Sequence, residues 1–113
     1  MQQFEQQKRQ RIAALMTELE SALRKQQLWQ SVRPSEQALA SVEPFAIDSL
    51  TFTQWLQFIF IEKITQLLQL NLPLPTAMSI APMASEYFKL KSNTCPEIVA
   101  LITTIDLTMN EKA

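Results

Sequence analysis

Residues 52–72, FTQWLQFIFIEKITQLLQLNL, are the stretch that decides the fold of this chain. On a helical wheel they carry one long apolar stripe with its flanks, formed by Phe52, Leu56, Phe60, Ile61, Ile64, Leu67 and Leu68. Trp55, Phe58 and Ile59 fall outside this stripe, and Phe58 lies almost opposite it. A helix that is apolar on two faces is normally the buried middle member of a bundle. We therefore predict a central core helix over these residues.

Both ends of this central helix are marked in the sequence. Thr51 and Gln54 have the spacing of a capping box, in which each side chain satisfies a backbone N–H of the first turn. Pro73 and Pro75 end the helix, because a proline lacks the N–H donor and disfavours helical geometry in the residue before it.

The central helix is expected in a protein core and not in a membrane. Nine of its 21 residues are polar. Glu62 and Lys63 stand at its centre, where each charge would cost roughly 2.5–3.5 kcal/mol in a bilayer. We expect both to point outward at a helix edge. Phe60→Ala is predicted to cost about 3–5 kcal/mol, and Gln57→Ala to stay within about half a kcal/mol.

The composition favours a single domain over residues 1–113 and disfavours a nucleic-acid-binding protein. The chain is long enough to bury about two thirds of its extended surface. Ten basic and eleven acidic residues leave a formal charge of −1, which disfavours bulk electrostatic binding of a phosphate backbone. No apolar leader with a cleavage site opens the chain, so we expect a reduced cytoplasmic setting.

The chain has no histidine, no glycine and one cysteine. The absence or scarcity of these residue types excludes several classes of functional site. Without histidine the chain lacks the usual general base and the commonest metal ligand. With one cysteine it cannot form an internal disulfide or a multi-thiolate zinc site. Without glycine it has no phosphate loop, no Rossmann fingerprint and no Asn-Gly hairpin. We therefore expect a helical protein with no catalytic residues, no cofactor and no metal.

Three further helices are predicted around the central one. Apolar residues recur with helical spacing over residues 2–29 and again over residues 95–110. A shorter helix is predicted from about 82 to 91, with Pro82 near its first turn. Thr94 and Glu97 form a second capping box before the last helix. The expected fold is all-α, a single-domain four-helix bundle.

A long ordered connection over residues 31–50 joins the first two predicted helices. Phe45, Ile47 and Leu50 are too apolar for an idle loop, and we expect them to cover the second apolar face of the central helix. The alternative is that this face stays open and forms a homodimer. The covering loop, and with it a monomer, is the favoured interpretation.

Several charged or reactive residues have a structural interpretation that outweighs a functional one. Lys8, Arg9 and Arg11 suggest an RNA contact, but a solvated helix end explains them as well. Asp48 suits a turn or cap. Cys95 lies at a predicted helix N-terminus, where the helix dipole lowers a thiol pKa, yet a lone thiol without histidine is usually a bystander.

The predicted working surface lies between residues 72 and 87. Three prolines in ten residues hold residues 73–82 extended, so docking there would cost little conformational entropy. The candidate interaction residues are Pro73, Leu74, Pro75, Met78, Ile80, Pro82, Glu86 and Tyr87. The alternative is that the apolar members of this set seal the end of the bundle.

Several short motifs resemble the YqcC-like family of small bacterial proteins. They are Leu23-Arg24-Lys25 with Trp29, Pro44-Phe45 with Asp48, Trp55-Leu56-Gln57, Leu67-Leu68, Leu74-Pro75, Ile80-Ala81-Pro82 and Glu86-Tyr87-Phe88. The resemblance runs from about residue 19 to residue 107 and implies a four-helix bundle. The genes of this family often lie beside the gene of a tRNA pseudouridine synthase, and the name of that enzyme is sometimes attached to the family. Relatives often have Pro-Arg where this chain has Glu62-Lys63, so no role tied to that kink or arginine is expected here.

The function we expect is that of a small non-enzymatic interaction protein with a protein partner. The resemblance adds an accessory role in tRNA modification and supplies no catalytic residues. The alternatives are direct participation in tRNA pseudouridine synthesis, and RNA binding. Pseudouridylation needs a large mixed α/β domain with an active-site aspartate, which 113 mostly helical residues cannot provide. Direct nucleic-acid binding is opposed by the net charge.

Overall fold

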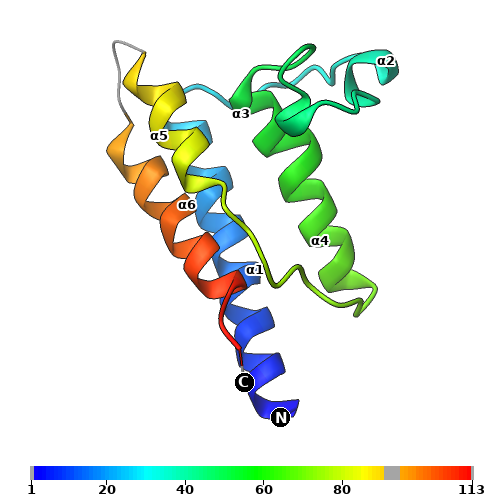
Figure 1. Ribbon diagram of the computed structural model, residues 1–113, viewed down its shortest axis with the longest axis vertical. Coiled ribbons are helices and arrows are strands. Elements are labelled where there is room, and N and C mark those ends of the chain that lie inside the picture. Colours follow the sequence, from blue (N-terminus) through cyan, green and yellow to red (C-terminus); the bar gives the residue numbers. More distant parts are fainter. Residues whose placement is uncertain (1, 91–94, 113) are drawn as a thin grey trace.

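The computed structural model describes residues 2–90 and 95–112, and all regular structure in these ranges is helical (Figure 1). The elements are α1 (Gln2–Lys25), α2 (Glu36–Leu39), the 3₁₀ turn η1 (Pro44–Ala46), α3 (Phe52–Trp55), the π-helical segment η2 (Leu56–Ile61), α4 (Glu62–Gln69), α5 (Ala81–Lys89) and α6 (Pro96–Met109). The prediction of an all-α fold is confirmed. The finer prediction of a four-helix bundle stays a prediction.

The helices do not pack against one another equally. α1 and α6 share the most extensive contact, and α5 lies against α6. The helix formed by α3, η2 and α4 stands on the other side of α1, with side chains filling the space between (Figure 1). The fully buried side chains come from α1, this central helix and α6, and they are Ile12, Leu19, Leu23, Leu56, Ile64, Ile98, Ile102, Ile105 and Met109.

The central helix begins as the sequence predicts. The Thr51 side chain accepts a hydrogen bond from the Gln54 backbone N–H (3.2 Å), and Gln54 Oε1 accepts one from the Thr51 N–H (2.9 Å). Its middle is not an ordinary α-helix, because η2 has π-helical hydrogen bonding over six residues. Five of those six residues are buried, which fits a segment that is apolar on two faces. Short π-helical segments within α-helices often occur at functional sites.

Two helices end earlier than predicted, each at a residue with left-handed backbone geometry. α1 ends at Lys25, before a turn in which Gln27 has φ 61°, and α4 ends at Gln69, before Asn71 with φ 56°. In both turns the next N–H bonds back to a carbonyl five residues earlier, Leu28 to Leu23 (2.8 Å) and Leu72 to Leu67 (2.9 Å). This is the Schellman arrangement, which usually has glycine at the left-handed position. The chain has no glycine, so nothing in the sequence marks the end of α1, whereas Asn71 followed by Pro73 marks the end of α4.

The long connection covers the second face of the central helix, but only in part as predicted. The Phe45 ring meets Trp55 edge-on at 4.8 Å, and Leu50 is buried. Ile47 is 63% exposed, so its predicted covering role is wrong. Phe58 is covered instead by Arg33, whose guanidinium lies 5.8 Å from the ring centre.

The last two helices occupy nearly the predicted residues. α5 begins at Ala81 with Pro82 in its first turn, and α6 begins at Pro96 and ends at Met109. The predicted end of α5 at residue 91 and the Thr94 side of the second capping box lie outside the described residues. None of the helices described is long and apolar enough to span a bilayer.

Candidate interaction surface

The first basic residue of α1 is buried, which corrects the expectation of a solvated helix end. Lys8 is 3% exposed, and its Nζ donates to the Met109 carbonyl at 2.7 Å and to the Glu111 carbonyl at 3.0 Å. These carbonyls belong to the C-terminal end of α6, where backbone acceptors lack intrahelical partners and the helix dipole is negative. Lys8 therefore acts as a cap for the last helix.

The neighbouring arginines are engaged at the same end of the molecule. Arg9 donates to the Leu67 carbonyl (2.9 Å) and the Leu72 carbonyl (2.8 Å), where α4 ends. Arg11 forms a two-point ion pair with Glu111, its shorter contact being 2.6 Å. The Arg11 hydrogen bond lowers the pKa of the Glu111 carboxyl. The three cations thus stabilise the ends of α4 and α6.

The other residues weighed as functional hold local structure. Ser41 Oγ donates to Asp48 at 2.5 Å, which confirms a turn role for the aspartate. Glu62 forms an exposed ion pair with Arg33 (2.6 Å). Cys95 is buried, and burial raises the pKa of its thiol, opposite to the direction expected at a helix N-terminus. The described residues contain no group of three or more Cys, Asp or Glu side chains placed to hold a metal.

The predicted working surface is divided between two ends of the molecule. Pro73 and Leu74 line a hollow with Glu5, Lys8, Arg9, Asn71 and Thr76, near the start of α1. Glu86 and Tyr87 line a different groove, beside η1. Of the remaining candidates, Pro82 is exposed, Pro75 and Met78 are half-buried, and Ile80 is buried.

Asp106 of α6 and Asn110, which follows the end of that helix, hold the connection that contains these prolines. Asn110 accepts a hydrogen bond from the Met78 N–H (2.7 Å) and donates one to the Met78 carbonyl (2.8 Å). Asp106 Oδ2 accepts from the Ile80 and Ala81 N–H groups, both at 2.8 Å. With Leu74 and Ile80 both buried, this part of the connection seals the molecule, as the alternative interpretation held.

The groove beside η1 is the most apolar hollow described, and we call it the η1–α5 groove. It has a volume of about 340 Å³ and lies between the long connection and α5. Its lining residues are Phe45, Ile47, Leu50, Thr51, Phe52, Met83, Glu86, Tyr87 and Leu90. Ile47 and Leu90, which is 83% exposed, stand in water at its edges.

An aromatic cluster forms the floor of the η1–α5 groove. Phe52 is its centre, with ring centres 6.2 Å from Phe45, 5.5 Å from Tyr87 and 6.4 Å from Phe88. Trp55 stacks beside Phe52 at 6.1 Å. Aromatic pairs at such separations stabilise one another beyond their buried area. The floor is therefore rigid and continuous with the core.

The wall formed by η1 has an uncommon backbone. Phe45 and Ala46 have φ values of 56° and 49°, in the left-handed region that residues with a Cβ normally avoid. Such strain persists only where the surroundings determine it, and it is frequent at functional sites. Here the packing of the Phe45 ring on Trp55 and Phe52 holds the wall in place.

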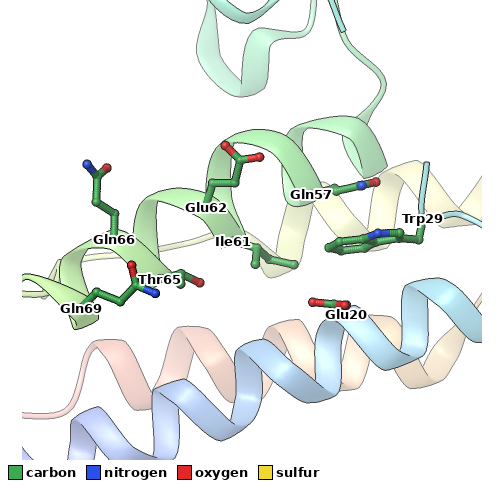
Figure 2. A pocket seen from close by; sticks show the side chains of 8 residues that line it. All are labelled: Glu20, Trp29, Gln57, Ile61, Glu62, Thr65, Gln66 and Gln69. Atoms are coloured by element: carbon green, nitrogen blue, oxygen red, sulfur yellow. The ribbon is translucent and has the colours of Figure 1, made fainter. Parts of the chain in front are cut away.

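Figure 2 shows a second hollow, of about 310 Å³, between α1 and α4. Its lining residues are Glu20, Trp29, Gln57, Ile61, Glu62, Thr65, Gln66 and Gln69. Its carboxylates are engaged, Glu20 with Arg24 (2.9 Å) and Glu62 with Arg33, and Glu62 and Gln66 point away from α1 in the view. The hollow therefore lacks a set of converging unengaged charges.

Gln57, on the edge of this hollow, is buried at 5% exposure, which corrects its predicted minor role. Its Oε1 accepts from the Gln30 N–H (2.9 Å), and its Nε2 donates to the Gln30 carbonyl (2.8 Å). This two-way amide pair fixes the chain that leaves α1 against the central helix. The Trp-Leu-Gln motif therefore contains a structural anchor.

Sequence reasoning found Glu86 and Tyr87 but missed the opposite wall of the η1–α5 groove. The sequence predicts Phe45, Ile47 and Leu50 as a cover for the central helix, not as the wall of a groove. The available signal was an apolar residue in a connection, which does not distinguish a covering side chain from an exposed one.

The fold and the sequence both have close counterparts among known proteins. The solution NMR structure of protein YqcC from Escherichia coli superposes with a TM-score of 0.80 at 27% identity, over 94% of this chain and 91% of that one. The uncharacterised YqcC sequence of E. coli K12 is 33% identical over 72 residues, 64% of this chain and 66% of YqcC. An uncharacterised protein of Haemophilus influenzae is 34% identical over 74 residues, 66% of this chain and 70% of the relative.

A protein of Pectobacterium carotovorum named tRNA pseudouridine synthase C matches differently. It is 41% identical over 58 residues, which are 51% of this chain but 15% of that protein. A family model described as tRNA pseudouridine synthase C, DUF446, matches residues 11–108. With most of the chain inside that match, and with YqcC similar in both sequence and fold, the chain belongs to the DUF446 family of YqcC-like proteins.

Proposed function

We propose that this protein is a non-enzymatic interaction protein that assists a tRNA pseudouridine synthase in the cytoplasm. The observation that carries the proposal is the Pectobacterium protein, whose chain contains a segment similar to this one and a much larger remainder. When two modules lie in one polypeptide, each is held near the other at a high effective concentration. Separate chains that do the same work need a binding surface instead.

The roles of the aspartates support a non-catalytic part. Pseudouridylation needs an active-site aspartate, and this chain has two aspartates in all. Asp48 accepts a hydrogen bond from Ser41 within its turn. Asp106 is buried and caps the start of α5 through two backbone N–H groups. Asp48 and the Oδ2 atom of Asp106 are thus occupied in holding the fold.

The engagement of the basic cluster supports a protein partner and not direct RNA binding. Lys8, Arg9 and Arg11 all bind within the chain. A phosphate backbone would have to compete with helix-end carbonyls and with Glu111 for these cations. Because counterion release at phosphates drives non-specific RNA binding, cations already engaged contribute little to it.

The test uses the protein together with the tRNA pseudouridine synthase of the same bacterium. We expect the two purified proteins to co-elute from a sizing column and the synthase to modify tRNA faster, or at lower tRNA concentration, with this protein present. This protein alone should form no pseudouridine. Independent elution at low salt together with an unchanged rate would contradict the proposal, as would turnover by this protein alone that survives repurification.

A further inference from the structure

We propose that the η1–α5 groove docks a short partner segment whose apolar anchor side chains are flanked by a basic residue. The identity of the partner as a tRNA pseudouridine synthase rests on the proposed function, whereas the chemistry of the segment is inferred from the groove itself. The occupant is a heterologous peptide segment and not a second copy of this chain.

Apolar side chains that stay exposed at the groove indicate that the segment binds through apolar anchors. Ile47 is 63% exposed and Leu90 is 83% exposed, and they stand on opposite edges of the same hollow. Below them the floor is aromatic, with the Phe52 and Tyr87 rings 5.5 Å apart. Exposed apolar side chains that gather around one hollow are typical of interaction sites. A side chain entering the groove would be enclosed by aromatic and aliphatic groups.

The size of the groove limits the occupant to a few side chains. Its volume of about 340 Å³ lies at the lower end of the roughly 300–1,000 Å³ that small-ligand pockets occupy. It is therefore suited to one or two bulky anchors presented by a short segment. A groove of this kind matches recognition of a peptide by a few anchor positions.

The charged residues of the groove walls indicate the charge of the segment that binds there. Among the described residues that line the groove, Glu86 alone carries a charge. The two described wall segments, residues 43–52 and 83–90, also carry Glu43 and Asp48 against one cation, Lys89. A complementary segment is therefore cationic. A second copy related by a two-fold axis would bring the acidic walls together, which disfavours self-association here.

The strained wall makes the groove ready to bind. Phe45 and Ala46 have left-handed backbone geometry, and the Phe45 ring packs on Trp55 at 4.8 Å. The neighbouring wall starts at the capping box of Thr51. Because the site is already ordered, an incoming segment does not have to order it, and less binding free energy is lost.

The experiment selects binders without assuming their sequence. A phage-displayed library of random 16-residue peptides is panned against the full-length protein at low salt, and enriched peptides are measured by fluorescence anisotropy. We expect enriched sequences to combine bulky apolar residues with Arg or Lys. We expect their binding to weaken at least tenfold in Leu90→Glu and Ile47→Glu, and several-fold in Glu86→Lys.

The matched control is Leu107→Glu, which changes an equally apolar side chain of α6 that is 66% exposed and outside the groove. It should bind the selected peptides like the unchanged protein. All four substituted residues are exposed, so each variant should keep its helical circular dichroism. No enrichment, enrichment of acidic peptides, or equal weakening by the control would each overturn the inference. So would a concentration-dependent dimer that Leu90→Glu dissolves.

The groove variants also separate this inference from the proposed function. If the synthase binds and the groove variants bind it equally well, the groove inference fails while the accessory role stands. If the groove selects cationic apolar peptides but the synthase does not bind, the accessory role fails while the groove inference stands. Synthase binding that is lost in Leu90→Glu and kept in Leu107→Glu supports both.

Discussion

At the end of the molecule where α1 begins, Lys8, Arg9 and Arg11 are engaged with helix carbonyls or with Glu111. Figure 1 shows the end of α5 at the opposite end of the molecule. The apolar side chains of Ile47 and Leu90 stand in water there, at the edges of the η1–α5 groove. The sequence suggested the reverse, with charges facing solvent at the first end and apolar residues covering a core at the other.

The difference between the two ends shows which surface is available to a partner. A cation that already binds groups within its own chain contributes little to binding a partner. Lys8, Arg9 and Arg11 are engaged in this way at the ends of α4 and α6. Exposed apolar groups have no such internal role, and their contact with water is unfavourable by roughly 25 cal/mol per Å². The end with engaged charges is structural, and the end with exposed apolar groups is where we place binding.

The largest expected effect tests whether the groove floor belongs to the core. Phe52→Ala removes the centre of the aromatic cluster, and the loss of a buried ring should lower the free energy of unfolding by about 3–5 kcal/mol. Urea titration followed by circular dichroism measures it. Leu107→Ala, at an exposed site, is the control and should change it by less than about half a kcal/mol. A loss below 1 kcal/mol for Phe52→Ala would mean that the floor is separable from the core.

The next effect tests the structural end. Lys8→Met keeps the length and apolar stem of the side chain but removes the donor to the Met109 and Glu111 carbonyls. The buried one of these two hydrogen bonds, to Met109, comes from a charged group and contributes about 1.5–3 kcal/mol, so we expect a loss of about this size. The matched control is Lys63→Met, at an exposed position of α4. Equal unfolding midpoints for the two variants would show that Lys8 is solvated after all.

Gln57→Ala tests the anchor between the two ends. It leaves the Gln30 N–H and carbonyl without their amide partner, so the expected loss is about 1–3 kcal/mol. Gln66→Ala, an exposed glutamine of the same helix, should be nearly neutral. If the two substitutions are indistinguishable in thermal unfolding, water replaces the amide pair without cost.

Gln27→Gly compares ordinary backbone strain with the strain of the groove wall. A left-handed residue with a Cβ costs roughly 1–2 kcal/mol, and glycine recovers this minus about 0.5–1 kcal/mol of chain entropy. We expect a gain of up to about 1.5 kcal/mol with peptide binding unchanged. Gln10→Gly within α1 should instead destabilise. Weakened peptide binding by Gln27→Gly would show that the two strained sites are coupled.

The smallest effect is pH-dependent and concerns Glu111. Its pKa is lowered by the Arg11 hydrogen bond from an ordinary value of 4.5, so its contribution to stability is present above that value. The contribution is lost as the pH falls through the lowered folded-state pKa. Glu111→Gln should therefore lower the unfolding midpoint slightly at pH 7 and not at pH 2–3. The difference should also vanish in an Arg11→Met background; a difference that grows on acidification would reverse this assignment.

The sequence predicted well those features whose cause is local. The apolar stripe of the central helix and the Thr51–Gln54 cap depend on residues within a few positions of one another, and both predictions hold. The end at Lys25 was missed because Gln27 does not have the sequence signature of a helix stop, whereas Asn71 with Pro73 after it is such a signal, and the predicted end of the central helix was only three residues late.

The features that were missed depend on partners far along the chain. Lys8 is buried because residues 109 and 111 pack against it. The sequence around Lys8 alone would fit a solvated lysine equally well. The η1–α5 groove forms where a connection meets a helix some 40 positions later, so neither segment alone indicates a hollow. The sequence around Ile47 and Leu90 has no pattern that would distinguish an exposed apolar side chain from a buried one.

The contact between Lys8 and Met109 also has a consequence for synthesis of the chain. Residues 101 positions apart must meet before the end of α6 is capped, which is a long separation for a helical protein. At 5–20 residues per second, a ribosome needs roughly 4–17 s to pass from the end of α1 to the end of α6. Throughout that interval the apolar face of α1 lacks its main packing partner. Of the helices described, α1 is therefore the one that waits longest for its main packing partner, and a chaperone that holds nascent chains would meet its apolar face exposed.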